Sequence, residues 1–419
     1  MNIDLIPTTT KKEYDFFTFD EFRSNLQDTL IKLDNQIKIL KEKDSEGDAT
    51  AKVYLYIYQG LHSIITAERK YRAGDYANAI NEYGEGGKSI SRFQRMSSGF
   101  AIEFQQEAER LDLFSKGRLS ESQALKKGVR IEDQITNLIE ATNSYTLEAE
   151  IVEKLKNHLQ IYNAYARMNF VRGLVNRLEG QKAQVGKDYY LAKRKHLDAY
   201  RAFVKAAYYN PSYVIWIEEQ NKTIKLILNK LVNDKASKTW GVAYKLAAEG
   251  KFTESSESCK LASKLYLRAS KLAEEEKDAL ILQAYSHMLK ASMYEANANE
   301  FIKNKNDAKS AVRQFELAME TMKIAIDHYP KQDEDKNILK KWGAKMNYYQ
   351  GYYYQAQGIH NLDEEKYPEA LNLFNNANEA FQNGLKEAVE SRDEDMKSLL
   401  EKSLAEAKGY IGMCKTVLD

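Results

Sequence analysis

The sequence contains few of the residues that interrupt regular secondary structure. Only 4 prolines and 20 glycines occur among 419 residues. Because proline and glycine end helices and form tight turns, their scarcity favours long helices and argues against a loop-rich β-sandwich or a disordered chain. The length would allow two or three average domains, but an array of stacked helix pairs can also grow as a single body. We predict an all-α protein.

Cysteine and histidine are also scarce, and their positions do not suggest a metal site. The two cysteines, Cys259 and Cys414, lie in apolar helical contexts without a CxxC spacing, and the six histidines show no HxxxH or HExxH spacing. Zinc sites need such clustered ligands, so we expect no metal and no cofactor. We expect both cysteines to be small buried residues. They do not form a disulfide framework, which is compatible with a reducing cytoplasm.

Net charge and long apolar runs are missing as well. The 62 Lys and Arg residues nearly balance the 61 Asp and Glu residues, so no overall field attracts nucleic acid. No run approaches the ~18 apolar residues of a membrane span, and the N-terminus lacks a basic stretch followed by an apolar one. These absences predict a cytoplasmic protein with no nucleic-acid partner and with membrane association that is peripheral or indirect at most.

Motifs for catalysis are equally hard to find. The glycines between Gly84 and Gly87 follow no predicted strand and precede no Gly-Lys-Ser/Thr, so they do not form a phosphate-binding loop. The acidic runs carry no Glu-x-x-His pair of the kind that holds a di-iron centre. We therefore predict no catalytic residue.

Four regions differ along the chain. Residues 1–19 read as an extended, aromatic-rich N-terminal segment, and residues 20–114 as an N-terminal helical lobe in which apolar residues recur every three or four positions. The polar stretch 115–132 is the predicted internal linker. Residues 133–419 are predicted to form a helical solenoid that ends in a capping helix near 398–417. Helical segments of roughly 20 residues, about twice the mean length, imply about a dozen helices paired in long hairpins.

An internal repeat is the strongest positive signal. Three positions, Gly74, Gly250 and Glu365, align as equivalent turns, and the residues that follow them match in size. The matched columns are Tyr76, Phe252 and Tyr367; Ala79, Ser255 and Ala370; Tyr83, Cys259 and Phe374; Gly86, Ala262 and Ala377; and Ile90, Tyr266 and Phe381. This pattern predicts helix hairpins with a flexible turn, small residues where the helices approach, and large residues that fill the next groove.

These residues resemble tetratricopeptide repeats. Gly74-Asp75-Tyr76, Ala79 and Tyr83 are similar to the Gly-Asp-Tyr-x-x-Ala-x-x-x-Tyr core of that motif. The spacing between hairpins is irregular and the first helices are too long for a ~34-residue repeat. The prediction is therefore an irregular tetratricopeptide-like α-solenoid. Two weaker hairpins are expected over residues 161–207 and 284–326.

Tyrosine is abundant, with 28 copies, and several copies are clustered. Consecutive helical residues point 100° apart, so the tyrosines around Tyr349 and Tyr353, or around Tyr54 and Tyr58, cannot all face inward. Some of them would pack between hairpins. The others are predicted to line a groove that binds a helical or extended segment of a partner protein.

A second resemblance is more specific. Ile6-Pro7, the segment 10–16 (TKKEYDF) and the segment 76–93 resemble the ALIX-type Bro domain of ESCRT-associated proteins. That resemblance implies a helical domain that binds a short amphipathic helix of an ESCRT-III-like subunit. The sequence thus favours a non-catalytic scaffold or adaptor. A helical enzyme without recognisable motifs, or a small-molecule sensor, is the alternative, because helix bundles can form pockets without sequence motifs.

Overall fold

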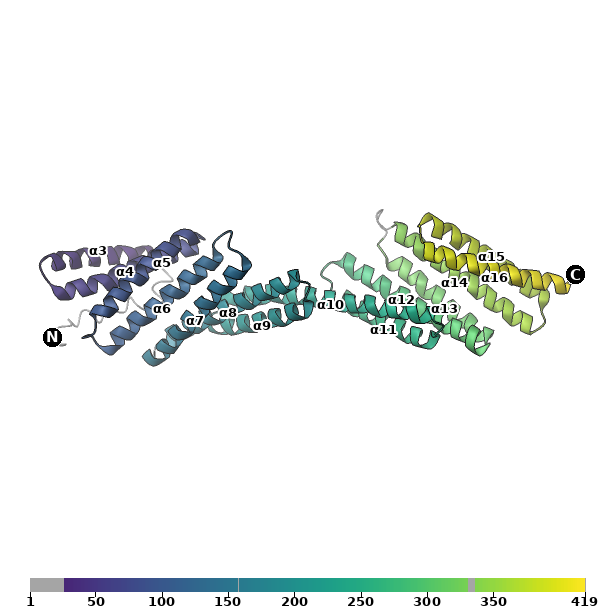
Figure 1. The fold of residues 1–419 in the computed structure, drawn as a ribbon, viewed down its shortest axis with the longest axis horizontal. Coiled ribbons are helices and arrows are strands. Elements are labelled where there is room, and N and C mark those ends of the chain that lie inside the picture. Colours follow the sequence, from purple (N-terminus) through teal and green to yellow (C-terminus); the bar gives the residue numbers. More distant parts are fainter. Residues whose placement is uncertain (1–25, 157, 331–335, 419) are drawn as a thin grey trace. The chain divides into compact units, whose positions relative to one another are not determined.

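The computed structural model describes residues 26–156, 158–330 and 336–418, and these residues form an all-α protein. They contain fourteen α-helices and one short 3-10 helix, without a strand (Figure 1). Successive helices pack on one another from α3 to α9 and again from α11 to α16, as in an α-solenoid. The predicted fold class is confirmed. The predicted extended segment 1–19 lies outside the described residues.

The helices belong to two compact units that divide at Ile224. Unit 1 contains α3 (Leu26–Ser45), α4 (Ala49–Arg72), α5 (Tyr76–Met96), α6 (Ile102–Leu125), α7 (Ile131–Leu155), α8 (His158–Val185), α9 (Tyr189–Tyr209), η3 (Pro211–Tyr213) and the beginning of α10 (Val214–Ala248). Unit 2 contains the rest of α10, α11 (Phe252–Ser270), α12 (Glu276–Lys305), α13 (Ala308–His328), α14 (Lys336–Asp363), α15 (Tyr367–Glu390) and α16 (Glu394–Leu418). The predicted capping helix falls within α16.

Five hairpins share one turn geometry, two more than the aligned columns predict, and the turns at Gly47 and Arg392 have the same geometry. In each, one residue adopts a left-handed conformation and the second helix begins two positions later. These turn residues are Gly74 (φ 77°), Lys187 (φ 59°), Gly250 (φ 76°), Asn306 (φ 51°) and Glu365 (φ 60°). The next N–H then bonds back to a carbonyl in the last turn of the first helix, as Asp75 does to Lys70 over 2.9 Å.

The two helices of each hairpin meet along a seam of small residues. Two small, buried residues stand seven and fourteen positions before the turn residue, or one position earlier in α12. They are Gly60 and Ala67, Gly173 and Gly180, Ala236 and Ala243, Ala291 and Ala298, and Gly351 and Gly358. A Cβ on Gly60 would lie only 2.6 Å from Cδ1 of Ile90, and one on Gly358 2.7 Å from the Phe374 ring. The large residues of the second helix therefore fit only against small ones.

The predicted hairpin-packing residues occupy this seam. Ala79, Tyr83, Phe252, Cys259, Ala262, Ala370, Phe374 and Ala377 are all buried, whereas Tyr76 and Tyr367, the first residues of their helices, are half-buried. Of the weaker hairpins, the second also buries residues along one face of its second helix, namely Phe315, Ala318, Met322 and Ala325.

The predicted linker 115–132 is wrong for most of its length. Residues 115–125 continue α6, and the helix breaks only between 126 and 130. Glu121 is 1% exposed and Ser122 is fully buried, because this polar face of α6 lies against neighbouring helices of unit 1. The boundary between the compact units lies instead within α10, so the predicted lobes 20–114 and 133–419 do not match units 1 and 2.

Candidate functional site

The four tyrosines predicted to line a groove do not form one. Tyr54 and Tyr58 of α4 are 9% and 8% exposed, and Tyr349 of α14 is fully buried. Only Tyr353 of α14 is partly exposed. Tyr349 donates a hydrogen bond to Oε2 of Glu295 over 2.9 Å, and burial raises its pKa well above the usual value. Three of the four are thus core residues, because α4 and α14 are covered by helices on both sides.

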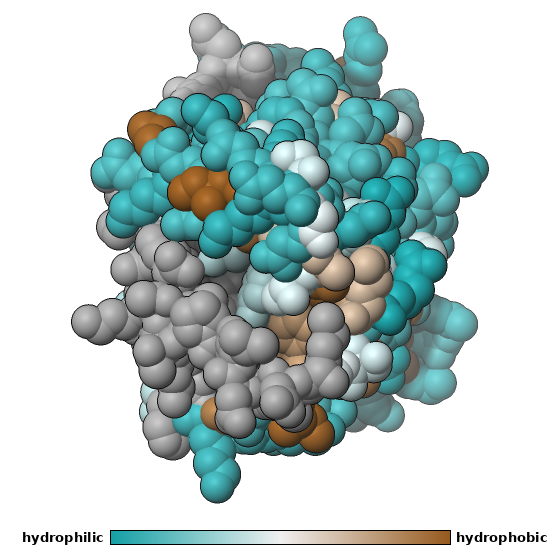
Figure 2. Space-filling view, turned by 90° about the vertical axis from the view of Figure 1, so that its left-hand side faces the viewer, coloured by the Kyte–Doolittle hydropathy of each residue, from teal (hydrophilic) through white to brown (hydrophobic). Residues whose placement is uncertain are grey.

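Exposed apolar side chains at the α3 end of unit 1 are mostly scattered. Figure 2 shows a largely hydrophilic surface there, with single apolar positions and one larger apolar area. On α3, Ile31 is 51% exposed and Ile39 is 44% exposed. Single exposed apolar residues are ordinary on protein surfaces and do not mark a site.

A groove of about 670 Å³ in unit 2 has the features that the tyrosine prediction sought. One wall is the part of α10 that carries Asp234 and Trp240, and the other is the start of α12 with the turn before it. Tyr266 of α11 lies between them. We call this the acidic groove.

The floor of the acidic groove belongs to a cluster of aromatic rings. The rings of Tyr266 and Tyr285 stack with centroids 5.7 Å apart, and Trp240 lies 6.4 Å from Tyr285. Below them, Trp342 lies 5.5 Å from Tyr285 and 5.0 Å from Tyr329. Five segments of unit 2 thus contribute one ring each. Packed rings give a large, preformed apolar surface at little entropic cost, as binding sites require.

The rim of the groove is mainly acidic. Glu274, Glu275 and Asp278 are exposed around the start of α12, where the helix dipole favours negative charge. Across the groove, Asp234 lies 3.4 Å from Lys230 in a half-exposed ion pair. Four carboxylates against one ammonium leave the rim negative. Burial raises the pKa of the Tyr266 phenol, and its hydrogen bond with Ser237 opposes that shift, so the ring stays neutral beneath the rim.

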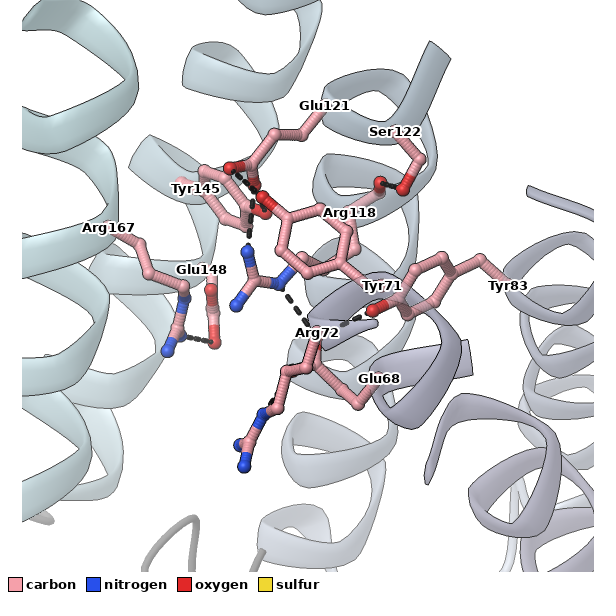
Figure 3. A network of polar contacts seen from close by, with 10 residues as sticks. All are labelled: Glu68, Tyr71, Arg72, Tyr83, Arg118, Glu121, Ser122, Tyr145, Glu148 and Arg167. Carbon is pink, nitrogen blue, oxygen red and sulfur yellow. Dashed lines mark hydrogen bonds and ion pairs between the residues drawn. The ribbon is translucent and has the colours of Figure 1, made fainter. Parts of the chain in front are cut away.

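Unit 1 contains a different feature, a buried network of charges and phenols (Figure 3). Arg118 of α6 lies between two carboxylates, 2.7 Å from Glu68 of α4 and 3.0 Å from Glu121 of α6. Tyr83 of α5 donates to Glu68 over 2.5 Å, and Tyr145 of α7 donates to Glu121 over 2.8 Å. Four successive helices are joined in this way.

The network continues toward α8 through Glu148 of α7. Its Oε1 accepts from Arg167 of α8 over 2.7 Å and from Arg110 of α6 over 3.3 Å. Arg110 also binds Glu107 over 2.7 Å. These side chains, except the partly exposed Glu107, are at least nine-tenths buried. Buried charges of both signs are tolerable only when they are paired, so we assign the network a structural role.

The electrostatics of the network hold its phenols protonated. Burial raises the pKa of Tyr83 and Tyr145 well above the usual value, and the nearby Glu68 and Glu121 raise it further. Burial disfavours the charge of Arg118, but the same two carboxylates more than compensate and raise its pKa. The tyrosines thus act as fixed donors and are not available as bases.

In the described residues, no group of three or more His, Cys, Asp or Glu side chains could hold a metal ion. No described helix is long and apolar enough to cross a membrane. Cys259 and Cys414 are buried as expected, and burial raises the pKa of the Cys259 thiol to about 11.

Comparisons with known proteins add little. No family model matches the chain, and no curated protein matches it. One solved structure that does match is a circular tandem repeat protein with novel repeat topology and enhanced subunit contact surfaces. It is 13% identical, the match covers 92% of this chain and 90% of that chain, and the TM-score is 0.22. At that score the likeness carries no argument, so the solenoid architecture rests on the hairpins themselves.

Proposed function

We propose that this protein is a non-catalytic scaffold whose acidic groove binds a short segment of a partner protein. The segment carries an aromatic or aliphatic anchor flanked by Lys or Arg. The observation that supports this proposal is the joining of an aromatic floor with an acidic rim in one groove. An apolar anchor gains most of its binding energy by filling such a floor, and charges at the rim set specificity and association rate.

The size of the groove fits this occupant. Ligand sites usually measure about 300–1,000 Å³, and the acidic groove lies within that range. Its walls come from α10 and α12, which are held by the same hairpin packing as the rest of unit 2. Because such walls are preformed, little conformational entropy is lost on binding.

The finer identity of the partner remains a prediction from the sequence. The resemblance to the ALIX-type Bro domain favours an ESCRT-III-like subunit and a cytoplasmic setting. Co-sedimentation with filaments of such a subunit would test it. If charge-reversal variants of the acidic groove no longer co-sedimented with the filaments, the ESCRT-III-like subunit would be identified as the partner that binds in this groove.

A defined peptide tests the groove directly. The probe is an amphipathic peptide of about 18 residues, five helical turns, with Leu and Trp on one face and Lys on the other. Isothermal titration calorimetry with the full chain should show binding that weakens as salt shortens the Debye length. An otherwise identical peptide with Glu in place of Lys should bind at least tenfold more weakly.

Variants locate the binding. Reversing the rim with Glu274→Lys, Glu275→Lys and Asp278→Lys should weaken the basic peptide at least tenfold. The matched control is Glu254→Lys with Glu257→Lys, which changes exposed charges on α11 outside the groove and should leave the affinity unchanged. Equal affinity for both peptides, or equal loss in the rim and control variants, would refute the proposal.

A further inference from the structure

A second groove lies in unit 1, between α5 and α6, and has the opposite charge. It encloses about 460 Å³. Small residues line its α5 side, among them Gly84 and Gly87, so the two helices leave an opening above them. A Cβ on Gly87 would lie 3.7 Å from Oδ1 of Asp112, which places that carboxylate across the groove from α5. We call this the basic groove.

Four cations surround the basic groove. Lys88, Arg92 and Arg95 stand on α5 at positions i, i+4 and i+7, and Lys116 stands on α6. All four are exposed. Lys88 also pairs with Glu85, three residues earlier on α5, over 2.7 Å. The groove therefore attracts an anionic ligand that extends along α5.

Asp112 sets a second requirement that a ligand of the basic groove must meet. Its side chain is 9% exposed, and Oδ2 pairs with Lys116 over 2.6 Å. Its other oxygen, Oδ1, is buried and has no hydrogen-bond partner among the described residues. A buried acceptor without a partner is unfavourable. The geometry suits a ligand that brings a hydrogen-bond donor to Oδ1 while it presents negative charge to the surrounding cations.

The spacing of the cations distinguishes between anions. Along a helix that rises 1.5 Å per residue, Lys88 and Arg92 are about 6 Å apart and Lys88 and Arg95 about 10 Å apart. A single phosphate group is too small to contact all three. Alternate residues of an extended peptide are about 6.6 Å apart, and every residue carries an N–H donor. Acidic residues at alternate positions of an extended chain match the spacing of Lys88 and Arg92, and a third lies about 3 Å beyond Arg95, within reach of its long side chain. The same chain brings the donor for Asp112.

We propose that the basic groove binds an extended acidic segment of a protein partner. Alternate Asp or Glu side chains pair with Lys88, Arg92 and Arg95, and one backbone N–H donates to Oδ1 of Asp112. This site is separate from the acidic groove and does not depend on it. Together the two grooves would let the scaffold hold segments of opposite charge.

The first experiment measures charge and spacing. Fluorescence anisotropy with the full chain compares a labelled peptide that alternates Glu and Ser with a peptide of the same composition whose glutamates are consecutive. The alternating peptide should bind more tightly, and inorganic phosphate should not displace it at equal concentration. Displacement by phosphate at that concentration would identify a simple anion site and overturn the proposal.

The second experiment locates the groove. Arg92→Glu with Arg95→Glu should weaken the alternating peptide at least tenfold. The exposed control Lys52→Glu on α4 changes charge in the same unit and should have little effect. The rim variants of the acidic groove should leave this affinity unchanged, so failure here is distinguishable from failure of the proposed function. No binding, or equal losses for Arg92/Arg95 and Lys52 variants, would overturn the proposal.

The third experiment tests the donor to Asp112. N-methylation of each peptide amide in turn should find one position at which affinity falls at least tenfold. In Asp112→Ala that penalty should shrink, because its acceptor is gone, as a double-mutant cycle would show. If the penalty is the same in Asp112→Ala, or if a water satisfies Oδ1 and no amide position is sensitive, the role of Asp112 is refuted. Circular dichroism should show unchanged helix content in Asp112→Ala.

Discussion

Tyr83 in unit 1 and Phe315 in unit 2 hold the same place in their hairpins, nine positions after the turn residue. The Tyr83 hydroxyl binds Glu68 inside the charged network, whereas Phe315 stacks on the ring of Tyr352. The other hairpins follow this division. In the other hairpin of unit 1 this position is occupied by His196, which contacts Gln220. In the other two hairpins of unit 2 it is occupied by Cys259 and by Phe374, both buried.

The difference shows that the hairpin accepts a polar or an apolar residue at this position, where four of the five hairpins carry a ring and the fifth carries Cys259. Small residues in the first helix and a larger one in the second satisfy packing in both units. Polarity is then set by the neighbouring helices. A polar residue is accepted only where they supply a partner for it, as Glu68 does for Tyr83.

Among the variants that test this comparison of the two units, one that breaks the charged network should lose the most unfolding free energy. Arg118→Met leaves Glu121 buried without its cation and Glu68 with only its 3.8 Å contact to Arg72, and we expect unit 1 to lose about 3–5 kcal/mol of unfolding free energy. Urea denaturation followed by hydrogen exchange and mass spectrometry would assign the loss to peptides of unit 1. Arg72→Met, which alters a more exposed arginine at the network's edge, is the control and should cost much less. A small cost for Arg118→Met would mean that the network contributes little.

Exchanging the two residues at the shared position should have intermediate effects. Phe315→Tyr places a hydroxyl in the apolar interior of unit 2 and should cost about 1–3 kcal/mol. Tyr83→Phe removes a donor from Glu68, which keeps its contact with Arg118, and should cost about 1–2 kcal/mol. The same hydrogen-exchange measurement would assign each loss to its unit. If Phe315→Tyr left the unfolding free energy unchanged, unit 2 would be shown to tolerate a buried hydroxyl that has no hydrogen-bond partner.

Substitutions at two turn residues should change the stability of unit 2 less, and in opposite directions. Gly250→Ala puts a Cβ in the left-handed region and should cost about 1–2 kcal/mol in unit 2. Glu365→Gly relieves the same strain and should cost little or stabilise the unit. Thermal unfolding monitored by circular dichroism would compare the two. A destabilised Glu365→Gly would show that its side chain contributes more than its backbone strain costs.

The smallest expected effect is a dependence on pH in unit 1. Burial lowers the pKa of His196 below its ordinary value near 6.5, so the unfolded chain binds the proton more readily than the folded one. The contribution to stability is complete above about pH 6.5 and is lost as the pH falls toward the folded pKa. Melting temperatures measured from pH 8 to 5 should therefore fall more steeply for the wild type than for His196→Met. Parallel curves would contradict this assignment.

The sequence predicts the repeating hairpins well because their signal is local. The columns after Gly74, Gly250 and Glu365 lie within one turn and one helix. The turns at Lys187 and Asn306 are harder to recognise. Ala308 stands where the aligned turns carry an aromatic residue, the last turn before Asn306 is one residue longer, and His196 stands in the column of Tyr83. The small residues of the first helices become visible only when those helices are aligned backward from the turn.

The functional features depend on contacts that sequence order hides. Arg118 and Glu121 lie in a polar stretch whose sequence is the same whether it faces water or buried partners, so the sequence alone predicts a linker there. The acidic groove joins Trp240, Tyr266 and Tyr285 from three helices. Its rings are not clustered in the sequence, whereas the dense tyrosines of α14 include the core residue Tyr349.

The seam of small residues also affects how a chain of this kind can evolve by gaining or losing helices. Each hairpin holds its small residues and the large residues that meet them within one continuous stretch, so a duplicated copy arrives with its own complete interior. The one-residue shift before Asn306 shows that a hairpin can have a longer last turn in its first helix and keep that interior. Duplication or deletion of a whole hairpin would therefore lengthen or shorten this protein with little disruption. Duplication or deletion of a single helix would leave the neighbouring helix without a matching surface.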